Sequence, residues 1–160
     1  PYGQFFVRDS QAGDLIFIAG GSGLSSPQSM ILDLLERGDT RQITLFQGAR
    51  NVAELYNREL FEALAAQHPQ FSYVPALNQA NDDPTWQGFK GFVHDAAKAH
   101  FDGRFGGQKA YLCGPPPMID AAITTLMQGR LFERDIFMER FYTAADGAGE
   151  STRSALFKRI

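Results

Sequence analysis

The sequence is poor in the residues that hold metals and disulfides. Its 160 residues include one cysteine, Cys113, and three histidines. A single thiol cannot form an internal disulfide, and it cannot supply the four thiolates that usually hold an iron–sulfur cluster. His94 and His100 are six residues apart, which turns them away from each other on a helix, and His68 precedes a proline. We therefore expect no metal site in this chain, and any iron–sulfur cluster would lie elsewhere.

Neither sign of charge is in large excess, and long apolar runs are missing. The chain has 15 lysines and arginines against 18 aspartates and glutamates, a net charge of −3. It therefore lacks a positive field that would attract a nucleic-acid backbone or an anionic membrane. No apolar run approaches the ~20 residues of a membrane span, and the first residues do not resemble a signal peptide. We expect a cytoplasmic protein with no nucleic-acid or membrane partner.

What the sequence does contain is an alternation of short apolar runs with helical patterns. Hydrophobic residues make up 44% of the chain, enough for one domain with a substantial core. The first run is apolar at every position, which is typical of a strand buried on both faces. Strands are expected over residues 15–19, 43–46, 71–74, 110–113 and 136–141. Their alternation with helices predicts an α/β fold: a doubly wound five-stranded parallel sheet with helices on both faces.

The helix boundaries carry more specific predictions. Serines and Pro27 follow the first glycine turn and are placed to cap a helix. Asn51 and Glu54 have capping-box spacing, ahead of a helical stripe that includes Tyr56. Residues 78–91 are polar and irregular, and we expect them to form a long functional loop with no element of its own.

A cluster of glycines follows the first predicted strand. Gly20-Gly21-Ser22-Gly23 stands between a buried strand and a helix. Without β-carbons the backbone can approach a ligand closely, and the helix N-terminus that follows favours an anion such as a pyrophosphate. Ser26 stands where the third glycine of a G-x-G-x-x-G motif would be, so the usual dinucleotide motif is not met. The cluster predicts either a phosphate-binding turn or, more simply, a tight turn between strand and helix.

The second strand has no acidic residue at its end, where many dinucleotide folds hold the adenosine ribose. It ends instead in Gln47-Gly48-Ala49-Arg50. Arg50 could pair with the 2′-phosphate of NADPH. From the residues alone, the choice between NADH and NADPH therefore stays open.

The fourth strand breaks at the motif Cys113-Gly114-Pro115-Pro116-Pro117-Met118. A thiol followed by glycine and prolines makes a soft, flat and rigid surface on which a planar ring can pack. The simpler interpretation is a buried structural cysteine before a helix that opens with proline. Glu139 and Phe141, two apart on the last strand, point the same way and could stand beside a bound ring. Otherwise Glu139 is only an edge residue at a strand end.

Two other functions fit parts of the sequence. Gly20-Gly21-Ser22-Gly23-Leu24 comes close to the nucleophile elbow of α/β-hydrolases, with Ser22 as the nucleophile. Leu24 replaces the final glycine of that motif, however, and the later histidines fall in a predicted helix. The 14 phenylalanines would also suit a redox-inert docking module of the same fold. Nucleotide titration would identify the docking module, and an active-site serine probe the hydrolase.

Taken together, these motifs resemble the pyridine-nucleotide domain of the ferredoxin–NADP reductase family. The first residues, Pro1-Tyr2-Gly3-Gln4-Phe5, are similar to the segment that closes the flavin domain in that family. The glycine turn at 20–24 is similar to the family's phosphate turn, and residues 113–118 are similar to its nicotinamide-side motif. Trp86-x-Gly88-x-x-Gly91-x-Val93 matches its mid-domain signature. Within the family, residues 45–51 and 111–122 look most similar to the reductase components of bacterial multicomponent phenol hydroxylases.

That resemblance implies an activity and an order of domains. Such a reductase takes a hydride from NADH onto FAD and passes single electrons through a 2Fe–2S cluster to a di-iron oxygenase that hydroxylates phenol. This chain would hold the end of the flavin domain over residues 1–8, the NAD-binding domain over 9–142 and a tail over 143–160. We would then expect a fragment that binds NADH, with the flavin and cluster domains elsewhere and no reductase activity of its own.

The resemblance also implies roles for individual residues. The pyrophosphate would be held by Gly20, Gly21, Ser22 and Gly23. The nicotinamide would be lined by Cys113, Gly114, Pro115, Pro116 and Met118. Glu139 and Phe141 match an acid-x-aromatic pair that lies near the nicotinamide and flavin rings in the family. Cys113 and Glu139 are the expected catalytic residues.

Overall fold

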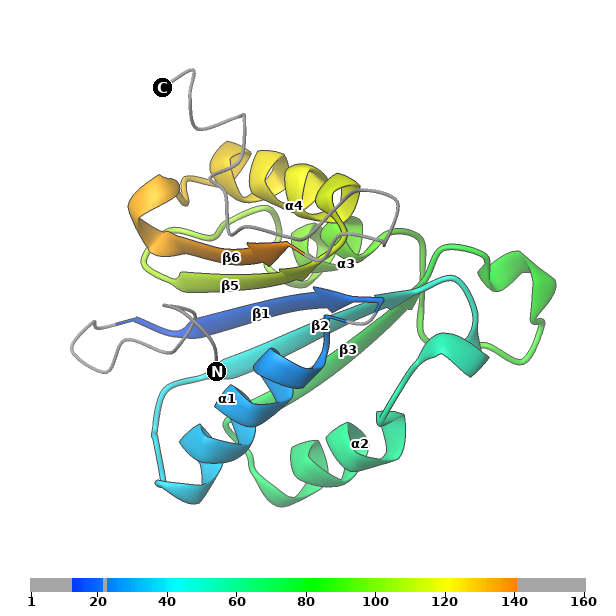
Figure 1. Ribbon diagram of the computed structural model, residues 1–160, viewed down its shortest axis with the longest axis horizontal. Coiled ribbons are helices and arrows are strands. Elements are labelled where there is room, and N and C mark those ends of the chain that lie inside the picture. The colour runs from blue at the N-terminus through cyan, green and yellow to red at the C-terminus, as the bar shows by residue number, and fades with distance from the viewer. Residues whose placement is uncertain (1–12, 22, 141–160) are drawn as a thin grey trace.

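In the part of the chain that the structure describes, six parallel strands form a central sheet with helices on both faces (Figure 1). The computed structural model describes residues 13–21 and 23–140. The strands are β1 (Leu15–Gly20), β2 (Ile43–Ala49), β3 (Phe71–Leu77), β4 (Phe89–Lys90), β5 (Lys109–Gly114) and β6 (Ile136–Arg140). Their order across the sheet is β4-β3-β2-β1-β5-β6, and every pair is parallel. The predicted doubly wound α/β fold is confirmed, with six strands in place of five.

Four α-helices of the described residues make up the two outer layers. Helices α1 (Ser25–Glu36) and α2 (Arg58–Gln67) cover one face of the sheet, and α3 (Val93–His100) and α4 (Pro116–Gln128) cover the other (Figure 1). Three single-turn 3-10 helices lie in the connections: η1 (Val52–Glu54), η2 (Ala80–Asp82) and η3 (Glu133–Asp135). Within the described residues, no helix has both the length and the apolar character needed to cross a membrane.

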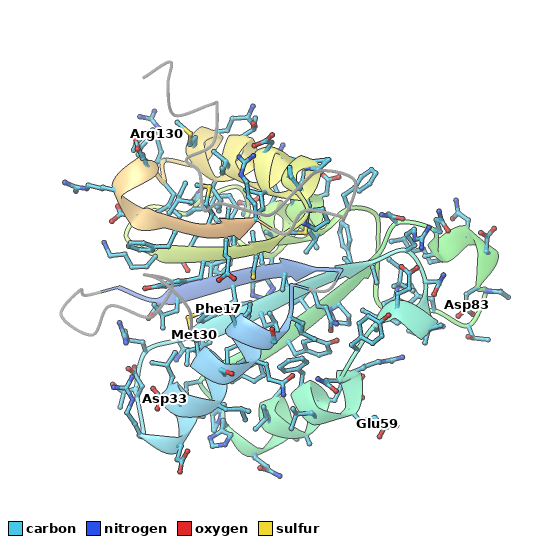
Figure 2. The ribbon with its side chains drawn as sticks, viewed as in Figure 1. Phe17, Met30, Asp33, Glu59, Asp83 and Arg130 are labelled. Atoms are coloured by element: carbon cyan, nitrogen blue, oxygen red, sulfur yellow. The ribbon has the colours of Figure 1, made fainter. Side chains whose placement is uncertain are left out.

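Strand β1 is buried at all six positions and contributes to the core on both faces. Ile16 and Ile18 pack in the cluster under α3 and α4, whereas Leu15 and Phe17 pack in the cluster under α1 and α2. Figure 2 shows Phe17 and Met30 together in the layer between β1 and α1. Fully burying a side chain of this size contributes about 1.5–3 kcal/mol, so the alternation along β1 stabilises both layers.

The predicted helix caps are wrong in both places. Helix α1 follows Leu24, and no described side chain makes a capping hydrogen bond at its N-terminus. Asn51 precedes only the short η1, again without a side-chain cap. Helix α2 begins at Arg58 after Asn57, whose φ is +58°, so Tyr56 lies before the helix instead of on its apolar stripe. The left-handed residue redirects the chain, a change that periodicity cannot reveal.

The segment 78–91 is more ordered than a structureless loop, and that prediction is also wrong. It contains η2 and the short edge strand β4. Trp86 organises it, because its indole packs in a small cluster with Leu55 and Leu77 and its Nε1 donates to the backbone oxygen of Phe89 at 3.0 Å. The guanidinium of Arg58 lies over the indole, 5.1 Å from the ring centroid. One buried tryptophan thus gives this segment a core of its own.

Candidate functional site

A pocket of about 700 Å³ opens at the carboxyl end of the sheet. Its lining comes from the segments that follow β1, β2 and β3 and from the start of α3 and α4. The pocket crosses four neighbouring strands, β3 to β5, a span of about 14 Å because strands lie about 4.8 Å apart. From β1 the chain moves outward to β4 and then returns through α3 to β5. Open α/β sheets bind their ligands at such a reversal of strand order.

Glycines at three adjacent strand ends shape the base of this pocket: Gly20 and Gly48 line it, and Gly114 lies just outside the lining. Gly20 lies in register with Gly48 of β2, and Gly114 ends β5 on its other side. A β-carbon on Gly20 or Gly114 would stand 2.5 or 2.6 Å from atoms of Met118, and one on Gly48 would stand 2.9 Å from Cβ of Val93. The absent side chains let Met118 and Val93 lie directly on the sheet, which leaves the space above them open.

The turn after β1 approaches β5 closely. Gly21 has φ +58°, and Gly23 donates its N–H to the carbonyl of Gly20 at 3.0 Å. A β-carbon on Gly23 would stand 2.7 Å from the backbone oxygen of Cys113, so this position requires glycine. Gly20 and Gly21 line the pocket. Ser22 lies outside the described residues.

The first turn of α4 forms an apolar wall. Pro115 precedes the helix, and Pro116 and Pro117 are its first two residues. None of the three has a backbone N–H, so this helix N-terminus offers fewer donors to an anion than most. Pro115, Pro117 and Met118 line the pocket here. The wall suits a planar ring better than a phosphate.

Cys113 and Glu139 lie side by side but do not line this pocket. They are paired in register on β5 and β6. The Cys113 side chain is fully buried in the cluster on the α1 side of the sheet. Burial, and to a lesser extent the charge of Glu139, raise the pKa of the thiol, so it stays protonated. Phe141 lies outside the described residues.

Arg50 and Glu54 form an ion pair at the end of the pocket opposite the first turn of α4. The guanidinium Nε lies 2.9 Å from Oε1 of Glu54, and the backbone N–H of Arg50 donates to Oε2 of the same carboxylate at 3.2 Å. The hydrogen bond from Arg50 holds the pKa of Glu54 below its ordinary value. The carbonyl of Arg50 accepts the N–H of Gln79 at 3.0 Å, which ties the pair to the segment after β3. The guanidinium of Arg50 is thus already hydrogen-bonded to a carboxylate of the same chain.

The structure gathers only some of the residues predicted from sequence. Those in the pocket lining are Gly20, Gly21, Arg50, Pro115 and Met118. Those outside it are Gly23, Cys113, Gly114, Pro116 and Glu139. Gly23 and Gly114 act on its shape through close packing, as described above.

The sequence analysis missed a group of pocket residues that follow strands β2, β3 and β4: Glu54, Tyr56, Asn78, Phe92 and His94. Tyr56 and Phe92 are 56% and 57% exposed, unusually open for large hydrophobic side chains. The imidazole of His94 stacks on Phe92, with ring centroids 5.7 Å apart and planes 14° apart. The one available signal was their position just after strand ends. Among the described residues, no three potential ligands gather into a metal site.

Comparison with known proteins agrees with this geometry. The family model for the oxidoreductase NAD-binding domain matches residues 17–124. The chain is 95% identical over 160 residues to the phenol 2-monooxygenase reductase component DmpP of Pseudomonas sp. (strain CF600). It is 68% identical over 160 residues to the phenol hydroxylase P5 protein of Acinetobacter pittii (strain PHEA-2). Each alignment covers 100% of this chain and 45% of the relative.

A solved structure shows the same fold at lower identity. The crystal structure of the Amycolatopsis cytochrome P450 reductase GcoB has a TM-score of 0.80 and 31% sequence identity. That match covers 90% of this chain and 43% of the other. The chain thus spans under half the length of each of these three proteins. The motifs, the pocket at the reversal of strand order and the family match agree, and the chain belongs to the oxidoreductase NAD-binding domain family.

Proposed function

We propose that this chain is the NADH-binding part of the reductase component of a multicomponent phenol hydroxylase. The observation that carries the proposal is the glycine-floored pocket across four strand ends. The printed names of the two relatives supply the biological system. In this proposal residues 9–142 form the nucleotide domain, residues 1–8 end a flavin domain, and residues 143–160 form a tail.

The lining gives the dinucleotide a direction. The donor-poor wall at Pro115 and Met118 fits the nicotinamide, and the turn at Gly20 and Gly21 fits the diphosphate. The adenosine then lies at the Arg50 end. When bound, the nicotinamide supplies the hydride. The chain's own task is to hold that ring in one orientation and to keep water away from it.

We also propose a role for Cys113 and Glu139 outside the pocket lining, at the strand ends on the far side of the sheet from the ring. Both lie at strand ends beside Gly114, on the side of the sheet away from Met118. As a buried neutral thiol, Cys113 shapes the strand end on which Gly23 packs. Glu139, together with Phe141 two residues later, is the proposed boundary toward the flavin.

The ion pair at the adenosine end favours NADH over NADPH. A 2′-phosphate there would have to displace Glu54 from Arg50 or lie beside its carboxylate. A phosphate monoester carries about −1.5 to −2 charges at neutral pH, so either choice is costly. Arg50 is therefore proposed as part of the cofactor site, but as the partner of Glu54 and not of a 2′-phosphate.

The other cofactors and the partner belong to the longer protein. Residues of this chain do not fit a 2Fe–2S cluster, because its one cysteine is buried and neutral. We propose that the rest of the reductase holds the cluster and most of the FAD contacts. Electrons would pass from there singly to a di-iron oxygenase that hydroxylates phenol.

Calorimetric titration of the purified chain with NADH tests the proposal. We expect saturable binding, and we expect Ala121→Phe to weaken it at least about tenfold because Ala121 lines the pocket. Thr124→Phe, on the exposed side of the same helix, is the matched control and leaves binding unchanged. No binding by the folded chain, or equal binding by both variants, would overturn the proposal. The chain alone, without flavin, is expected not to reduce an artificial acceptor with NADH.

A further inference from the structure

The pocket offers few charges for a diphosphate. Among the described residues that line it, the ionisable side chains that can be cationic are Arg50 and His94, and the one acid is Glu54. Arg50 is already held by Glu54 through its Nε and its backbone N–H. The prolines at the start of α4 remove N–H donors from that side. Of these two basic side chains, Arg50 is held by a carboxylate at hydrogen-bond distance and His94 is not. A diphosphate bound here would therefore meet His94 as its cationic side chain.

The position of His94 is well defined. It is the second residue of α3, and the N–H groups of Asp95 and Ala96 both donate to the carbonyl of Phe92. The backbone carbonyl of Phe92 thus accepts the first hydrogen bonds of the helix, and the imidazole of His94 stacks on the ring of Phe92. Stacking fixes the plane of the imidazole, and His94 lines the pocket. The N–H groups of Val93 and His94 have no acceptor within the helix, so a phosphate here also meets backbone donors.

Other charges around His94 leave it available for a ligand. On its own helix, Oδ1 of Asp95 lies 3.6 Å from Nε2, which makes an ion pair when His94 is protonated but is longer than a normal hydrogen bond. Across the pocket stand Arg50 and Glu54, which neutralise each other. The residues that α4 contributes to the lining, such as Met118 and Ala121, carry no charge. The strand ends under α3 contribute Gly48, Ala49 and Ala76, which are also neutral.

From this arrangement we propose that His94, in its protonated form, binds the diphosphate of the dinucleotide at the first turn of α3, so that affinity rises as pH falls. The inference rests on the proposed function and names a residue and a regulation within it. Histidine is the side chain whose charge ordinarily changes between about pH 5 and 8. A charge-assisted hydrogen bond to phosphate is roughly twice as strong as a neutral one.

The experiment measures binding of ADP-ribose by calorimetry at about pH 8 and about pH 6, where histidine changes charge. ADP-ribose contains the diphosphate but no terminal phosphate that would itself titrate, and adenosine serves as the probe without phosphate. The variants are His94→Gln and His94→Lys, with His100→Gln as the matched control. His100 is on the same helix, exposed and outside the pocket.

We expect the unmodified chain to bind ADP-ribose about three- to tenfold more tightly at the lower pH. His94→Gln loses this increase, His94→Lys binds tightly at both pH values, and His100→Gln retains the increase. Adenosine shows no such increase. A flat profile for the unmodified chain, an unchanged increase in His94→Gln, or the same increase with adenosine overturns the inference.

Titration with NADH at both pH values separates this inference from the function on which it rests. Saturable NADH binding combined with a flat ADP-ribose profile leaves the nucleotide domain intact and rejects only the role of His94. Absence of NADH binding at both pH values rejects both.

Discussion

The hydroxyl of Tyr73 donates a hydrogen bond to Oε1 of Gln47 at 2.5 Å, in the layer between the sheet and α2. Gln47 is only 3% exposed, and its Nε2 donates to the backbone oxygen of Tyr56 at 3.0 Å. Both ends of a buried amide are therefore satisfied. The same chain of contacts ties Tyr56, on the rim of the pocket, to the second and third strands.

Replacing Tyr73 with Phe removes the donor and leaves the buried Oε1 of Gln47 without it. We expect a loss of about 1–3 kcal/mol in the free energy of unfolding. Urea denaturation would measure it, with Tyr56→Phe as the control because only the backbone of Tyr56 enters this network. Equal stability of the two variants would show that the hydrogen bond contributes nothing net.

Stability should decline in alkaline solution. Burial raises the pKa of Cys113 and of Tyr73 above their ordinary values of 9.0 and 10.0. Above those values the unfolded chain loses these protons while the folded chain keeps them, so the free energy of unfolding falls as pH rises. Urea midpoints from about pH 8 to about pH 10.5 would show the decline. Cys113→Ala should delay its onset, and an identical profile in that variant would contradict the assignment.

Gly23→Ala should damage the turn after β1. Its β-carbon would stand 2.7 Å from the carbonyl oxygen of Cys113, and a backbone atom cannot give way cheaply. We expect a loss of about 1–3 kcal/mol together with weaker NADH binding. Gly106→Ala is the control, because its β-carbon would meet nothing closer than 3.9 Å. Thermal unfolding that is the same in both variants would rule out the close contact.

Phe92→Ala should weaken nucleotide binding without lowering stability. Phe92 is 57% exposed and lines the pocket, and stacking of a base on an aromatic ring contributes about 1–3 kcal/mol. NADH affinity should therefore fall roughly tenfold. Phe132→Ala is a matched control, since Phe132 is 51% exposed and is not among the pocket residues. If the two variants bound NADH equally well, Phe92 would have no part in the site.

Glu54→Gln should change the preference between the two nucleotides. The amide no longer neutralises Arg50, which becomes available to a 2′-phosphate. We expect the ratio of NADPH to NADH affinity to rise roughly tenfold. Competition between the two nucleotides measures the ratio directly. Glu59→Gln, on the exposed side of α2, should leave it unchanged.

The fold could be predicted from the sequence because its main signals are local. Five apolar runs of strand length alternate with helical periodicity, and the residues at 15–19 are apolar throughout. Strand β4 was missed because it is two residues long and is held in place by the buried Trp86. The boundaries of α2 were missed because they depend on the left-handed backbone of Asn57.

The site could be predicted only where it is built from backbone. The glycines at 20 and 21 and the proline-rich start of α4 have sequence signatures, because missing β-carbons and missing N–H groups act directly. The ion pair of Arg50 with Glu54 depends on the turn between them, and the orientation of His94 depends on how α3 lies over β2. Such side-chain relationships arise from tertiary packing, which spacing alone does not specify.

Met118 touches the places where β-carbons would stand on both Gly20 and Gly114. An alanine at one of these positions could be accommodated by a smaller residue at 118, but that change would leave an empty space beside the other. Gly48 depends in the same way on Val93. Tolerated variation at the base of the pocket should therefore be collective, with residues from distant parts of the chain replaced as compensating sets.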